Sequence, residues 1–354
     1  MRSKTSLKSF IRRHLIVKHP FLITLLLLAL AIILSVTVGS VFIPPLTFLQ
    51  VIVKRLNNVN LTSAQETASV ILFQLRLPRT VLVALTGAAL AGSGGAYQGL
   101  FRNPLADPYL IGVASGAGLG AVIAMSIRWP YTLGGLLAIP MAAFLAAILT
   151  VTLVYSLARV GRTAPTTNLI LAGVALGSFA TAVTSFLMLR SQGDLHQAIA
   201  WLLGGGTLGG WNPILACLPY ILVGLGVLVL MGHNLNVLQF GDEQAQQLGI
   251  SVEKVRRIII LAASLTTAAA VAFSGIIGFV GLIIPHIIRL AWGSDYRRLI
   301  PLAIISGAWL LLFADVLARV VIAPQEIPVG IVTALGGAPF FLWILRRAKS
   351  QAFW

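Results

Sequence analysis

Apolar runs separated by short polar segments fill almost the whole chain after residue 20. A helix needs roughly 20 apolar residues to cross a bilayer, and lipid leaves no partner for unpaired backbone groups. Runs of about this length lie at about 21–43, 77–100, 109–127, 133–158, 168–189, 213–232, 258–280, 299–322 and 329–345, with a shorter one at 282–292. They predict an all-α integral membrane protein with about ten transmembrane helices.

Composition supports this class. Of 354 residues, 58% are hydrophobic and 10% are charged, against roughly 25% charged in average soluble chains. The net charge of +16 comes from short basic clusters between apolar runs, which is typical of topology signals and not of a nucleic-acid surface. The single cysteine, Cys217, excludes a disulfide framework and a cysteine-rich metal site.

The first 20 residues carry six Lys or Arg and no acid. The apolar run that follows is longer than the ~7–15 residues of a cleaved signal peptide, so residues 1–20 are interpreted as a basic cytoplasmic tail and 21–354 as a single transmembrane domain. With ten spans both termini are cytoplasmic, and 18 of the 25 Lys and Arg residues fall inside against 7 outside. This distribution satisfies the positive-inside rule.

One polar island, residues 233–257, interrupts the apolar pattern and falls on the cytoplasmic side of this topology. Acids in a first turn favour a short helix from Asp242, and Gly249 is suited to end it in a left-handed cap. Ser251 is expected to cap a second short helix that runs to Arg257. The island therefore predicts a compact cytoplasmic knob that binds a partner; a solvated loop is the alternative.

The two halves of the chain contain related sequences. TGAALAGSG (86–94) and TAAAVAFSG (267–275) agree at six of nine positions, and the same offset of 181 carries Pro104 onto Pro285. Five spans separate the copies, so they are expected to run in opposite directions. Inverted repeats with broken helices are typical of transporters, although small-residue runs also recur by chance in packing faces.

No phosphate-binding loop, zinc-protease motif or nucleophile elbow is present, so we expect neither a catalytic site nor a metal site. A gradient-driven carrier needs ionisable groups deep in its spans. The main candidates are Asp315 and Arg319, which are spaced i, i+4 on one helix and are able to neutralise each other. An ion-coupled transporter and, less favoured, an intramembrane enzyme are the alternatives from other classes.

Several long blocks resemble the permease family of ABC importers for iron-siderophores, haem and cobalamin. They include RLPRTVLVALTGAALAGSGGAYQGLFRNPLADPYLIGVASGAG (76–118), EQAQQLG (243–249), GFVGLIIPHIIRL (278–290), ADVLAR (314–319) and IPVGIVTALGGAPFFLWIL (327–345). The resemblance covers nearly the whole chain after the first span. It implies the type II ABC importer permease fold.

The resemblance also implies partners: a second permease, identical or paralogous, two cytoplasmic ABC ATPase subunits and a periplasmic or lipid-anchored binding protein. ATP and Mg²⁺ would be bound by the ATPase and no cofactor by this chain, which would lie in the cytoplasmic membrane of a prokaryote. The island would supply the contact with the ATPase through Asp242, Glu243, Gln244, Gln247, Leu248 and Gly249.

At the outer face, the resemblance implies that Arg76, Arg79 and Arg319 receive acidic residues of the binding protein. A planar guanidinium suits bidentate carboxylate binding. Simple interfacial snorkelling is the alternative for each, and pairing with Asp315 is an equal alternative for Arg319.

Thr166 and Thr167 match the family's cytoplasmic gate, with Pro165 before them, although Thr167 is also suited to cap a helix. Residues 191–211 are expected to form a short outer helix and a glycine turn, or else a plain loop. The leading hypothesis is an importer permease for an iron-siderophore, with cobalamin and haem as open alternatives.

Overall fold

The computed structural model describes residues 19–39, 44–57, 62–127, 129–130, 132–161, 163–190, 195–206 and 209–349. Apart from an isolated bridge between Val160 and Thr163, the regular structure of these residues is helical. The helices are α2 (Pro20–Thr37), α3 (Pro45–Leu56), α4 (Ser63–Val70), η1 (Ile71–Arg76), α5 (Leu77–Leu100), η2 (Pro108–Ile111), α6 (Val113–Met125), α7 (Leu133–Ala158), α8 (Thr166–Arg190), α9 (Leu195–Leu202), α10 (Asn212–Leu230), α11 (Gly232–Leu238), α12 (Asp242–Gln247), α13 (Val252–Ser274), α14 (Val280–Trp292), α15 (Tyr296–Val320) and α16 (Val329–Lys349).

Ten helices correspond to the ten predicted spans. Within the described ranges, seven helical segments are long and apolar enough to cross a membrane, and three shorter apolar helices, α6, α14 and α16, accompany them. The longest segment is continuous from Gln65 to Leu100 and contains a six-residue π-helical stretch, η1. The prediction of an all-α membrane protein with about ten spans is confirmed.

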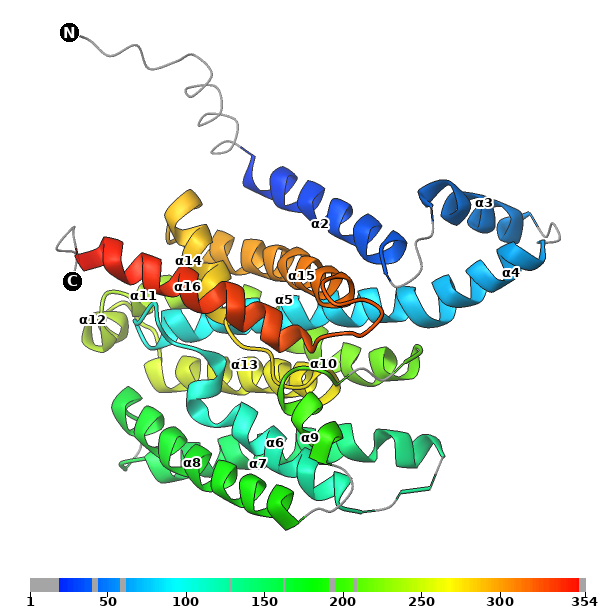
Figure 1. Ribbon diagram of the computed structural model, residues 1–354. Helices are drawn as coiled ribbons and strands as arrows, with labels where there is room; N and C mark the ends of the chain where they lie inside the picture. The colour runs from blue at the N-terminus through cyan, green and yellow to red at the C-terminus, as the bar shows by residue number, and fades with distance from the viewer. Residues whose placement is uncertain are drawn as a thin grey trace, which may run out of the picture.

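The bundle is built around α5, which packs most extensively against α15 (Figure 1). Gly87 and Gly307 face each other at the crossing of these two helices. A Cβ on Gly307 would lie 2.1 Å from the carbonyl oxygen of Gly87, and one on Gly87 would lie 2.2 Å from that of Gly307. The two backbones therefore touch, which is the small-residue packing that replaces the hydrophobic effect between helices in lipid.

The two related sequences lie on α5 and at the end of α13. These helices are antiparallel, because the first turns of α5 and the end of α13 line one cavity through Thr86 and Ser274. At the other end, Arg102 after α5 and Arg256 in the first turns of α13 both pair with Asp242. Each is followed by an irregular joint and then by an apolar helix of 13 residues, α6 or α14. The inverted arrangement predicted from the sequence is therefore present.

The island differs in part from its prediction. Asp242 to Gln247 form the expected helix α12, and Gly249 has the expected left-handed conformation, φ +83°. The prediction of a second short helix is wrong, because the residues from Val252 onward form the first turns of the span α13. Val252, Val255 and Arg256 are buried on one side of it, so its polar residues mark an exposed face and not a separate helix.

Smaller differences concern helix ends. The first span, α2, ends at Thr37, and residues 40–43 of the predicted run lie outside the described residues. The third span begins at Val113, after the short η2. Thr167 lies in the first turn of α8, one residue after its start, so it does not cap that helix.

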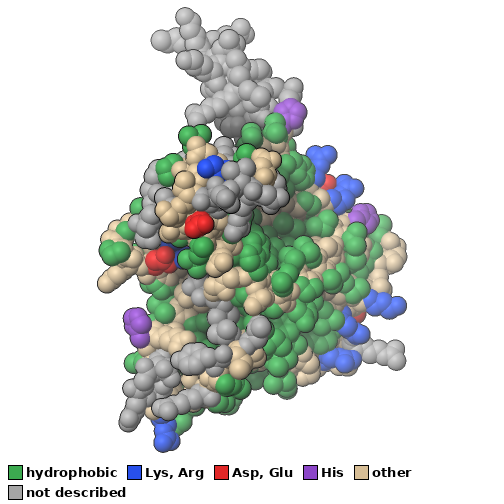
Figure 2. Space-filling view, turned by 90° about the vertical axis from the view of Figure 1, so that its right-hand side faces the viewer, with side chains coloured by type: hydrophobic (Ala, Val, Ile, Leu, Met, Phe, Trp, Pro, Cys, Tyr) green, Lys and Arg blue, Asp and Glu red, His purple; other side chains and the backbone are tan. Residues whose placement is uncertain are grey.

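The surface around the bundle is apolar. Figure 2 views the side of the molecule that lies on the right in Figure 1; hydrophobic side chains form a broad continuous area across its middle, and the charged side chains lie toward its margins. Leu189 of α8, Leu230 of α10 and Leu335 of α16 are among the large exposed apolar side chains. A surface of this kind suits lipid or another apolar helix and not water.

Candidate functional sites

Helix α12 protrudes at one end of the bundle, between α11 and α13 (Figure 1). Its inner side is anchored by Ala245, which is fully buried. Its outer side presents Glu243, Gln244, Gln247, Leu248 and Gly249, all exposed. Leu248 is 65% exposed, so this knob combines an apolar tip with polar flanks and is built as a contact surface.

Asp242, which was predicted to belong to the same contact, lies differently. Its carboxylate pairs with Arg102 at 3.3 Å and with Arg256 at 2.7 Å. Arg256 also pairs with Glu253. Asp242 is therefore engaged with its own chain, and the sequence did not indicate this because Arg102 is 140 residues away.

Two amides bind α11 to neighbouring helices. Gln239 Nε2 donates to Gly99 O at the end of α5, at 2.8 Å. Asn236 donates to Asp295 at 2.6 Å and accepts from the Tyr296 backbone at the start of α15. Hydrogen bonds from Arg297 and Asn236 hold the pKa of Asp295 below its usual range. Through α11, the knob is thereby fixed to the end of α5 and to the start of α15.

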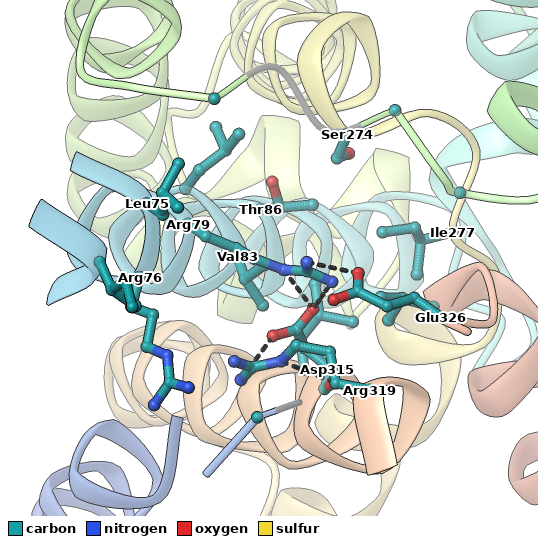
Figure 3. A pocket seen from close by; sticks show the side chains of 18 residues that line it. Leu75, Arg76, Arg79, Val83, Thr86, Ser274, Ile277, Asp315, Arg319 and Glu326 are labelled. Atoms are coloured by element: carbon teal, nitrogen blue, oxygen red, sulfur yellow. Dashed lines mark hydrogen bonds and ion pairs between the residues drawn. The ribbon is translucent and has the colours of Figure 1, made fainter. Parts of the chain in front are cut away.

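An ionic cluster lies at the opposite end of the bundle (Figure 3). Asp315 is fully buried; it accepts from Arg79 Nε and Nη2 at 3.0 and 2.9 Å and pairs with Arg319 at 3.0 Å. Arg79 also bonds to the exposed Glu326 at 2.6 Å. The Asp315–Arg319 pair expected from the i, i+4 spacing is confirmed, whereas the sequence did not indicate its connection to Arg79 and Glu326.

The third arginine of the predicted docking set, Arg76, is turned inward. Its side chain is buried and donates to the carbonyl oxygens of Val36 and Thr37 at 2.8 and 2.9 Å. These are orphan acceptors at the C-terminal end of α2. Arg76 thus stabilises the end of the first span, and this contact competes with any docking role.

A cavity of about 410 Å³ lies beside this ionic cluster. Its charged lining comes from Arg76, Arg79, Asp315, Arg319 and Glu326, and Thr86 and Ser274 add hydroxyl groups (Figure 3). Leu82, Val83 and Leu311 line its apolar side. Three arginines face two acids in the lining, so one positive charge is in excess, and the Arg79–Glu326 pair lies at its exposed edge.

The predicted gate residues begin helix α8 at the same end of the bundle as α12. Thr167 is exposed and Thr166 half-buried. Further along α8, Gly173, Gly177 and Ser178 line an open groove of about 780 Å³, with Asp107 and Tyr109 across from them. The sequence does not reveal this groove, although small residues repeat along one face of α8.

No group of three or more His, Cys, Asp or Glu in the described part of the chain is placed to hold a metal ion. The one cysteine, Cys217, is buried in α10. The charged side chains described at the two ends of the bundle make ionic and hydrogen-bonding contacts.

The bundle and its inverted repeat define a membrane transporter, and comparison with known proteins identifies the family. The model of the FecCD transport family matches residues 27–347, and the chain belongs to this family. It is an ABC importer permease with the type II fold.

Curated relatives align over most of their lengths. The chain is 45% identical to the cobalamin import system permease protein BtuC of Halobacterium salinarum, over 81% of this chain and 76% of that protein. It is 42% identical to the uncharacterized ABC transporter permease protein YvrB of Bacillus subtilis, over 90% and 91%. It is 40% identical to the hemin transport system permease protein HmuU of Yersinia pestis, over 82% and 87%.

A solved structure shows the same architecture. An inward-facing conformation of a putative metal-chelate type ABC transporter matches with a TM-score of 0.76 at 29% identity, covering 91% of this chain and 97% of that one. The ten spans and the broken helices therefore belong to a known permease fold, and the alternative of an ion-coupled carrier loses its support.

Proposed function

We propose that this chain imports a metal chelate by binding separate ATPase subunits at the knob formed by residues 241–249. The observation that carries the proposal is the two-sided construction of α12. Its outer side exposes Glu243, Gln247 and Leu248, while Asp242 and Ala245 fasten its inner side to the bundle. A surface that is exposed outward and rigidly held inward is suited to transmit force from a partner.

Hydrolysis of ATP is assigned to the partner, and the permease contributes movement. ATP and Mg²⁺ would be bound there, in the cytoplasm, and closure of the ATPase pair would displace α12. Since α12 is fixed to the ends of α5, α13 and α15 through its own contacts and those of α11, a displacement would tilt these spans and open or close the path.

The experiment that tests this proposal is co-purification of the chain with its ABC ATPase from detergent. We expect Glu243→Arg together with Leu248→Glu to lose the ATPase, because the pair reverses a charge and removes the apolar tip. Lys254→Gln, which alters an exposed charge on α13, is the matched control and should retain it. Equal retention of the ATPase by the double variant and the control would sink the proposal.

For the cargo, the names of the relatives favour cobalamin over haem, and both over the iron-siderophore that the sequence analysis placed first. The relative with the highest identity of the three is named for cobalamin and another for hemin, and the solved neighbour is described as a metal-chelate transporter. The test is uptake of cyanocobalamin, haemin and a ferric siderophore by cells that lack and then regain the gene. Restoration of siderophore uptake alone would contradict this order.

At the outer face, we propose that Arg79 takes part in docking a binding protein, with a second permease copy completing the path, whereas the contacts of the buried Arg319 with Asp315 and Ser35 compete with a docking role. Arg79 supports this proposal because its side chain is partly exposed and already binds the carboxylate of an exposed residue, Glu326. Arg76 is a poorer test residue than the sequence indicated, because Arg76→Glu would also release the end of α2. Arg79→Lys, which keeps a cation beside the buried Asp315 but loses the bidentate guanidinium, should weaken docking, and Arg190→Lys is the control that should retain it.

A further inference from the structure

Helix α5 ends in an unusual backbone conformation. Among the described residues only Arg102 and Phe279 have positive φ without being glycine, and Arg102 has φ +50°. The Asn103 N–H bonds to Gln98 O at 3.1 Å, a six-to-one bond that closes the helix. Arg102 thus occupies the position after a helix end at which glycine is strongly preferred, since a side chain is strained there.

The side chain that causes this strain has a specific contact. Arg102 Nη2 lies 3.3 Å from Asp242 Oδ1, in the first turn of α12. A Cβ on Gly241 would lie 3.5 Å from Arg102 Nη1, so the guanidinium lies over the start of α12. A glycine at position 102 would relieve the backbone and lose this contact.

Asp242 connects three helices. One carboxylate oxygen faces Arg102 at the end of α5, and the other pairs with Arg256, whose side chain is buried in the first turns of α13. The carboxylate itself sits on α12. Removing Arg102 or the charge of Asp242 would leave α12 anchored by Ala245 and joined to α5 indirectly, through the Gln239–Gly99 hydrogen bond at the end of α11, without its own ionic contact to the end of α5.

Helix α5 continues from this link to the far end of the bundle. Its first turn carries Arg79, which binds Asp315 and Glu326. A helix of 24 residues spans ~36 Å, enough to cross the membrane. The Arg102–Asp242 pair is therefore positioned to join α12 directly to the ionic cluster at the other face.

We propose that Arg102 and Asp242 are positioning residues that make α12 and α5 move as one body, so that a displacement of α12 reaches the Arg79 cluster. This inference rests on the proposed binding of an ATPase at α12. The strain at Arg102 is retained because the side chain transmits movement, and not because it stabilises the fold.

The test uses the complex of the chain with its ATPase in lipid nanodiscs, with a nitroxide label on Gln325→Cys in a Cys217→Ala background. Gln325 is exposed and neighbours Glu326. Trapping with Mg-ATP and vanadate should change the label's spectrum in the native chain. In Arg102→Gly we expect that change to fall at least about fivefold, the lower range of measured coupling between sites, while ATPase co-purification is kept.

The unfolding temperature distinguishes a role of Arg102 in transmitting movement from a role in stabilising the fold. Arg102→Gly should unfold at the same temperature as the native chain or higher, because glycine accepts the left-handed conformation. Arg102→Lys should retain the spectral change, and Asp242→Asn should lose it. The matched control is Arg159→Gly, an exposed arginine at the end of α7 in extended conformation, which should retain it.

The outcomes are distinguishable. A full spectral change in both Arg102→Gly and Asp242→Asn overturns the inference and leaves the proposed function standing. A drop in unfolding temperature for Arg102→Gly also overturns it, since the pair would then be structural. A native chain that retains no ATPase overturns the proposed function, and the inference with it.

Discussion

At the residue scale, the most informative group is a carboxylate with two cationic partners. Asp315 is fully buried and contacts Arg79 and Arg319. A buried charge is costly without partners, so each arginine offsets the desolvation of the acid. Arg319 has further acceptors in the carbonyl oxygens of Ser35 and Val38, and these connect α15 to the end of α2. One acid thus organises three helices.

Replacing this acid should cost far more than replacing its exposed neighbour. We expect Asp315→Ala to lower the stability of the permease by about 3 kcal/mol, because two guanidinium groups lose their buried partner. Glu326→Ala should cost less than about 1 kcal/mol, as exposed ion pairs do. Thermal unfolding in one detergent compares them; similar losses for the two variants would contradict the buried role of Asp315.

At the element scale, the contact between α5 and α15 depends on the absence of side chains. Gly87 and Gly307 bring two backbones together at the centre of the bundle. The sequence shows many glycines in apolar runs but does not show which of them meet. Gly226 of α10 illustrates the contrast, since a Cβ there would meet nothing within 4 Å.

Substitution of Gly307 and of Gly226 should therefore have opposite effects on stability. Gly307→Val would force α5 and α15 apart and should cost about 3 kcal/mol or more. Gly226→Ala should be neutral or stabilising by up to about 1 kcal/mol, because alanine favours the helix. The yield of monodisperse protein and its unfolding temperature measure both. A tolerated Gly307→Val would show that this crossing is not the tight contact described.

At the scale of the whole molecule, the structure places the α12 knob and the Arg79 cluster at opposite ends of the spans. The predicted topology assigns these ends to the cytoplasm and the outside. Helix order and the basic clusters support this assignment, since ten spans return both termini to the same side.

Cysteine labelling checks the orientation. In intact cells a membrane-impermeant maleimide should label Gln325→Cys, which is exposed at the Arg79 end, but not Gln247→Cys, which is exposed on α12. Inside-out vesicles should give the reverse. The native Cys217 is buried and provides a low background. Labelling of both positions from one side would contradict the ten-span topology.

The sequence by itself determined the features that depend on local periodicity. Apolar runs fixed the ten spans, Gly249 fixed the end of α12, and i, i+4 spacing indicated the Asp315–Arg319 pair, because each depends on neighbours within a few turns. Only the tertiary structure decided that Arg79 binds Asp315 across 236 positions, that Asp242 binds Arg102, and that Arg76 turns inward onto α2. Such pairings depend on which helices pack together, and packing in lipid is chosen by close backbone contact and ionic pairing, neither of which leaves a periodic pattern in the sequence.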